Sequence, residues 1–87
     1  MTYQVRISSP ARRDLNNLPE SVAAAVVELI FGALAENPQR IGKALTNELT
    51  GRFSARRGQY RIIYRINEEE IVVEVIRIAH RRNAYRT

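Results

Sequence analysis

The C-terminal half of the chain contains three successive runs with the pattern of β-strands, and these runs constrain the fold more than any other feature. Residues 52–57 and 60–66 each alternate between apolar and polar side chains, and the Gly58-Gln59 pair between them is typical of a hairpin loop. Residues 71–78 are rich in β-branched side chains and mostly apolar on both faces, as expected of a central strand. The sequence therefore predicts a sheet built largely from this half.

The N-terminal half predicts one further strand and two helices. Residues 3–7 alternate, and Ser9 followed by Pro10 indicates a helix start with Ser9 as the N-cap. Residues 19–36 form a second helical pattern, and residues 38–51 are a connector with one helical turn around 44–49. The order β-α-α-β-β-β predicts a single α+β domain over residues 1–87, with a small, mostly antiparallel four-stranded sheet and both helices on one of its faces.

The second helix is apolar over much of its circumference. One face carries Val22, Val26, Leu29 and Ile30, and further apolar residues widen it beyond a single stripe. Such a helix is expected to be buried on more than one side. Two explanations remain open: a partner protein covers the part that the sheet does not reach, or the short first helix and a chain terminus cover it.

Composition excludes several classes of function. The chain has no cysteine and a single histidine, so disulfides, thiolate metal sites and histidine-pair hydrolysis are not expected, and neither is a cofactor or metal ion. No apolar run is long enough to span a membrane, and the N-terminus does not have the pattern of a signal peptide. These features predict a soluble protein of the cytoplasm.

The positive charge is concentrated in the strand-rich half. Residues 1–50 carry five basic and five acidic side chains, whereas residues 51–87 carry nine arginines and four glutamates and thus the whole net charge of +5. Arginine presents a planar fork that binds phosphate through two hydrogen bonds. The alternation also places Arg56 and Arg61 on one face of neighbouring strands, while Arg81 and Arg82 follow the last strand. Two interpretations fit: a groove for an anionic substrate, or solvated surface arginines.

The segments GQYRIIYRI and EVIRIAHRRNAYR resemble the RelE toxins of the RelE/ParE superfamily, which belong to bacterial type II toxin–antitoxin modules. The connector over residues 42–51 and the segment ARRDLNNLP fit as well, so the resemblance covers essentially the whole chain. It implies a microbial-ribonuclease-like RelE fold and a ribosome-dependent endoribonuclease that cuts messenger RNA in the ribosomal A site. It also implies a cognate antitoxin, a possible heterotetramer with it, contacts with ribosomal RNA, and an antitoxin-facing apolar helix made by Val22, Val26, Leu29 and Ile30.

The resemblance assigns catalytic roles to Arg56, Arg61, Arg81 and Tyr85. Ser54 falls where many relatives have a basic residue, which leaves Arg52 or Arg57 as possible substitutes. The remaining residues expected to bind RNA or the ribosome are Arg12, Arg13, Arg52, Ser54, Arg57, His80 and Arg82.

The implied chemistry uses the substrate's own nucleophile. The 2′-hydroxyl of RNA attacks the adjacent phosphorus, giving a 2′,3′-cyclic phosphate and a 5′-hydroxyl, while Arg61 and Arg81 stabilise the charge that develops. Tyr85 either transfers a proton or stacks on a base, and His80 either acts in acid–base chemistry or makes an orienting hydrogen bond. Two other functions remain possible: a ParE-like inhibitor of DNA gyrase, and a non-catalytic basic module that binds RNA through charge alone.

Overall fold

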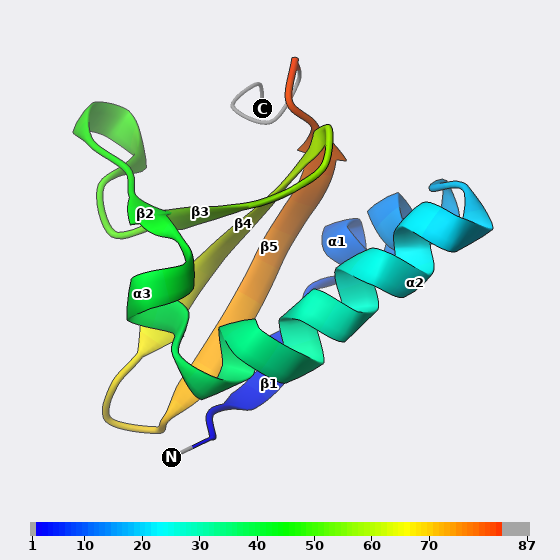
Figure 1. Ribbon diagram of the computed structural model, residues 1–87. Helices are drawn as coiled ribbons and strands as arrows, with labels where there is room; N and C mark the ends of the chain where they lie inside the picture. The colour runs from blue at the N-terminus through cyan, green and yellow to red at the C-terminus, as the bar shows by residue number, and fades with distance from the viewer. Residues whose placement is uncertain (1, 83–87) are drawn as a thin grey trace.

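The computed structural model describes residues 2–82, which form a mixed sheet with helices on one side (Figure 1). In chain order the elements are β1 (Gln4–Ile7), α1 (Ser9–Asn16), α2 (Glu20–Leu29), the π-helical segment η1 (Ile30–Leu34), α3 (Pro38–Ile41), β2 (Lys43–Ala44), the 3-10 turn η2 (Asn47–Leu49), β3 (Phe53–Arg57), β4 (Tyr60–Asn67) and β5 (Val72–His80).

The sheet has five strands in the order β1-β5-β4-β3-β2. β1 runs parallel to β5, and the other neighbours are antiparallel, so the predicted α+β class with a mostly antiparallel sheet is confirmed. The predicted number of four strands is wrong, because the connector contributes β2. This strand has only two residues, too few to show any alternation in the sequence.

The helices α1 and α2 lie on one side of the sheet, as predicted (Figure 1). Ala11 from α1 and Val26, Ile30 and Leu34 from α2 and η1 are fully buried in the core. They belong to one apolar cluster with sheet residues Ala55, Ile62, Tyr64, Val73, Val75 and Ile78. We call the opposite side of the sheet, which these core side chains do not face, the outer face.

Two helix boundaries differ from the prediction. The N-cap of α1 is Ser8 rather than Ser9: the Ser8 side chain accepts a hydrogen bond from the Ala11 N–H. The predicted single helix over residues 19–36 is divided, because Gly32 leaves helical geometry at φ −101° and ψ −107° and the backbone there is π-helical.

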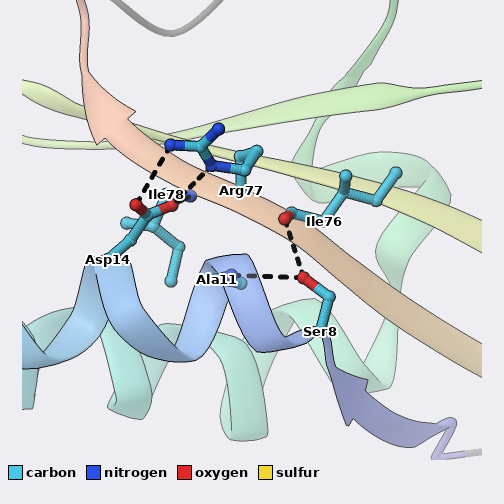
Figure 2. Close-up of polar contacts among 6 residues, drawn as sticks. All are labelled: Ser8, Ala11, Asp14, Ile76, Arg77 and Ile78. Atoms are coloured by element: carbon cyan, nitrogen blue, oxygen red, sulfur yellow. Dashed lines mark hydrogen bonds and ion pairs between the residues drawn. The ribbon is translucent and has the colours of Figure 1, made fainter. Parts of the chain in front are cut away.

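Side chains of α1 and of its N-cap satisfy backbone groups along the edge of β5 where β1 no longer reaches. The pairing of β1 with β5 ends at Ile7 and Val75. Beyond that point Ser8 Oγ donates to the Ile76 carbonyl at 2.8 Å, and Asp14 Oδ2 accepts from the Ile78 N–H at 2.8 Å (Figure 2). Asp14 also accepts two hydrogen bonds from Arg77, and this bonding raises the pKa of the guanidinium. An exposed strand edge is thereby closed.

A β-bulge in β5 changes which side chains face the core. Ile63 of β4 pairs with Arg77, but the next residue, Tyr64, pairs with Val75, so Ile76 has no partner in the ladder. An extra residue shifts the alternation of the strand. As a result Val75 and Ile78 both face the helices, whereas Arg77 lies on the outer face.

Candidate phosphate-binding face

The β3–β4 hairpin places Arg56 directly opposite Arg61, which confirms that the two share a face of neighbouring strands. Gly58, the first residue of the two-residue loop, has φ +60°, a conformation that tight hairpins require and glycine adopts readily. Core residues Ala55 and Ile62 flank the pair, so strand alternation turns both arginines to the outer face. Opposing side chains have Cβ atoms roughly 4.5–5.5 Å apart, close enough for two guanidinium groups to hold one anion.

The electrostatics separates this pair from the other arginines of the sheet. Arg65 is paired with Glu74, and Arg77 with Asp14 at 2.9 Å. Within residues 2–82 no carboxylate forms an ion pair with Arg56 or Arg61, and the Arg56 Nε contacts the Gly58 carbonyl at a long 3.4 Å. Arg61 Nη1 is buried without a hydrogen-bond partner in this part of the chain. A buried donor without a partner is costly, and a bound anion would satisfy it.

Arg81 is brought to the same end of the sheet. Its backbone N–H donates to the Gln59 carbonyl at 2.7 Å, which extends the β4–β5 pairing as far as the hairpin loop. Because the bulge shifts the alternation of β5, position 81 continues the series of residues on the outer face. Arg81 and Arg82 are both exposed.

His80 lies on the helix side of the sheet. It pairs with Tyr60, their rings meet edge to face with centroids 5.5 Å apart, and His80 Nδ1 accepts from the Arg82 N–H at 3.3 Å. Arg57, which also pairs with Tyr60, shares that side. Neither residue therefore joins the Arg56–Arg61 pair, although both were predicted to bind RNA or the ribosome.

Ser54 lies on the outer face of β3, between β4 and the edge strand β2. It is 9% exposed and pairs with Ile63 on one side and with Lys43 of β2 on the other. By alternation Arg52 would follow on the same face, although it precedes the first residue of β3. Sequence reasoning missed Lys43, because nothing in the connector indicates a strand. The pair Gly42-Lys43 is the only local signal: glycine marks a close backbone approach just before the basic residue.

The remaining site predictions fall elsewhere. Arg12 and Arg13 are exposed on α1, and Tyr85 lies outside the described residues. The expectation that Val26 and Ile30 face an antitoxin is wrong, because both are completely buried against the sheet; Val22 and Leu29 pack on the same core. The exposed apolar residues of this helix are Val27 and Phe31, at 38% and 55% exposure.

No helix within residues 2–82 has the length and apolar character needed to cross a membrane. The same residues contain no group of three or more His, Cys, Asp or Glu side chains suited to a metal ion.

Comparison with known proteins links this geometry to bacterial toxins. The family described as "ParE toxin of type II toxin-antitoxin system, parDE" matches residues 5–85. Two proteins of Mycobacterium tuberculosis are similar over nearly the whole chain. Toxin RelG is 52% identical over 86 residues, covering 99% of each chain, and Toxin RelE is 52% identical over 84 residues, covering 97% of this chain and 87% of its own. The crystal structure of the toxin–antitoxin complex RelBE2 from the same organism contains a chain with 51% identity and a TM-score of 0.89, over 92% of this chain and 99% of that one.

Proposed function

Because the chain belongs to the RelE/ParE family of toxins from type II toxin–antitoxin systems, we propose that it is a metal-independent endoribonuclease that cuts messenger RNA in the ribosomal A site. Its relatives at 52% identity are named RelG and RelE toxins, which favours the RelE type of activity within the family.

The observation that carries the proposal is the opposed Arg56–Arg61 pair with its unsatisfied guanidinium nitrogen. Like charges directly opposite in a sheet are destabilising. Within residues 2–82, carboxylates neutralise Arg65 and Arg77 but not this pair. A phosphodiester between the two side chains would offset their repulsion and accept from Arg61 Nη1. An inhibitor that acts only by protein contact has no need for such an arrangement.

In the proposed reaction the 2′-hydroxyl of the RNA attacks the adjacent phosphorus and the 5′-oxygen leaves. This step forms the 2′,3′-cyclic phosphate and breaks the bond to the next nucleotide without an added oxidant or metal. Arg61 and Arg81 stabilise the negative charge on the phosphoryl oxygens, and Arg56 orients the phosphate. Tyr85 is the remaining candidate for proton transfer to the leaving oxygen or for stacking on a base. The ribosome would hold the strand in the conformation for attack, which the small outer face alone does not impose.

The proposal includes a cognate antitoxin as the protein partner. The similar Mycobacterium tuberculosis chain was crystallised in a toxin–antitoxin complex. Val27 and Phe31 lie one helical turn apart and expose apolar surface of α2 and η1 that the sheet does not cover. A copurification assay with the product of the adjacent small reading frame tests this partner, and Phe31→Glu is expected to weaken the complex.

The activity is tested by primer extension on messenger translated in a reconstituted system with the purified toxin. Arg61→Ala and Arg81→Ala should each lower the cleavage rate by roughly 100-fold or more, the usual loss when one stabilising group for a developing anion is removed. Arg65→Ala is the matched control: it removes an arginine from the same strand and face, but one that Glu74 already neutralises. Tyr85→Phe then separates proton transfer from stacking, because it keeps the ring and loses the hydroxyl.

Two outcomes would overturn the ribonuclease. One is intact messenger together with accumulating gyrase–DNA adducts, which would identify a gyrase inhibitor in place of a ribonuclease. The other is cleavage that is equally fast in Arg61→Ala and Arg65→Ala, which would remove the arginine pair from the mechanism.

A further inference from the structure

The outer face contains a basic residue that the proposed mechanism does not use. Lys43, the only lysine of the chain, lies on β2 directly opposite Ser54. Directly opposed residues of an antiparallel pair share a face. Lys43 therefore lies on the same face as Arg56 and Arg61, at the outermost strand of the sheet.

The register puts Lys43 within reach of Arg56. The residue opposite Lys43 is two positions before Arg56 on β3, so Lys43 and Arg56 are diagonal neighbours across the two strands. Diagonal neighbours lie about 7–8 Å apart, a distance that long side chains span. The residue of β3 between these two positions on the same face is Ser54, whose side chain is short.

The backbone at Lys43 is fixed by a close approach to the core. A Cβ at Gly42 would lie 2.2 Å from Tyr64 Oη and 2.9 Å from the Ser54 carbonyl oxygen, so only glycine fits there. Tyr64, which is fully buried, donates its hydroxyl hydrogen to the Pro38 carbonyl and accepts a hydrogen bond from the Gly42 backbone N–H. This arrangement anchors a strand of two residues that its ladder alone would hold weakly.

The side chain itself remains available to a ligand. Lys43 is exposed, and no ion pair within residues 2–82 involves it. Lys43, Arg56 and Arg61 thus place three cations on the outer face of three adjacent strands, β2, β3 and β4. Cations arranged in this way follow a polyanion backbone rather than a single isolated anion.

We propose that Lys43 is a phosphate-binding residue that, beside Arg56, contacts the RNA backbone phosphate next to the one held between Arg56 and Arg61. This inference rests on the proposed ribonuclease function. It assigns to β2 the role of extending the binding face by one nucleotide, and it selects Lys43 rather than Arg57, which lies on the other side of the sheet.

The test measures binding separately from cleavage. A short 2′-O-methyl RNA, which cannot be cut, is titrated with full-length toxin at several salt concentrations and followed by fluorescence anisotropy. Lys43→Ala should weaken binding about tenfold, the loss typical of one hydrogen bond to a charged group. It should also lower the slope of log affinity against log salt by roughly 0.7, the value for one phosphate contact on a single strand. Lys43→Arg should retain both.

The control is Arg40→Ala, which removes one positive charge from an exposed position on α3, three residues away in sequence. If Lys43→Ala and Arg40→Ala weaken RNA binding equally, Lys43 contributes only general surface charge and the inference is overturned. The inference is also overturned if Arg52→Ala weakens RNA binding and Lys43→Ala does not. Thermal melts of all variants verify folding. Arg61→Ala distinguishes the failure of the two proposals. If Arg61→Ala abolishes cleavage and Lys43→Ala changes neither binding nor cleavage, only the proposed role of Lys43 is wrong. If neither the unmodified toxin nor any variant cuts messenger, the proposed ribonuclease activity is wrong.

Discussion

The contact of Asp14 with the edge of β5 predicts a large stability loss from one small substitution. The Asp14 side chain is 17% exposed and accepts from the Ile78 N–H at 2.8 Å and twice from Arg77, at 2.9 and 3.2 Å. In Asp14→Ala the N–H of Ile78, a residue only 2% exposed, loses its acceptor. An unsatisfied buried donor costs about 1–3 kcal/mol. The ion pair, in which the Arg77 side chain is 47% exposed, adds at most about 1 kcal/mol. The expected loss is therefore about 1–4 kcal/mol.

Urea denaturation followed by circular dichroism measures this loss, and a change of about 2 kcal/mol would lower the Tm of a domain this small by roughly 8–16 °C. Arg77→Ala isolates the ion pair and should cost less than about 1 kcal/mol. Asp14→Asn retains an oxygen acceptor and should fall between the two alanine variants. The reasoning is refuted if Asp14→Ala is as stable as the unmodified chain, or if Arg77→Ala costs as much as Asp14→Ala, because the backbone hydrogen bond would then contribute nothing.

Two further predictions concern the contact between Gly42 and Tyr64. Burial raises the pKa of Tyr64 to about 12 from 10.0, so the folded state keeps the phenol proton that the unfolded chain releases above pH 10. The stabilisation from this shift is complete below pH 10 and is lost as the pH rises toward 12. Tyr64→Phe should lower the unfolding free energy by about 1–2 kcal/mol at neutral pH. It should also flatten the decline of the unfolding free energy between pH 10 and 12, as measured by urea denaturation across that range. An equally steep decline in Tyr64→Phe would show that Tyr64 is not the group responsible. Gly42→Ala forces a methyl group against Tyr64 Oη and the Ser54 carbonyl, and should cost about 1–3 kcal/mol in thermal melts, as overpacking typically does. Gly42→Ala should also weaken RNA binding by displacing Lys43. A destabilised variant that binds RNA with full affinity would show that the Gly42–Tyr64 contact does not position Lys43.

The Arg56–Arg61 pair could be predicted from the sequence because local rules determine it. Gly58-Gln59 specifies a two-residue loop, and a loop of that length fixes which residues of the two strands face each other. The alternation of residues 60–66 then decides the face, since a slip by one residue would bury the arginines in place of Ile62 and Tyr64. No tertiary information was needed for this part of the site.

Lys43 and the partner-facing helix residues could not be predicted, for two different physical reasons. A strand of two residues has no period that the sequence could reveal. The close approach of Gly42 to Tyr64, which fixes the backbone beside β2, joins residues 22 positions apart in the chain. The helix pattern showed that α2 is apolar on more than one side but not which side meets the sheet. In the structure Val26 and Ile30 are buried against the sheet, and Phe31 is left exposed.

The bulge at Ile76 determines on which face of the sheet Arg81, a residue of the proposed chemistry, lies. Without it, uninterrupted alternation from Val73 and Val75 would turn positions 77, 79 and 81 toward the helices, and Arg81 would lie on the side away from Arg61. The sequence permits either register, because Ile76 and Ile78 are equally suited to a core. The structure selects the bulged register where β1 ends: Ser8 Oγ donates to the Ile76 carbonyl, and Asp14 accepts from the Ile78 N–H. The α1 residues that close the edge of β5 therefore also determine the face on which Arg81 lies, which is why a stability variant such as Asp14→Ala should lower cleavage even at temperatures where the protein remains folded.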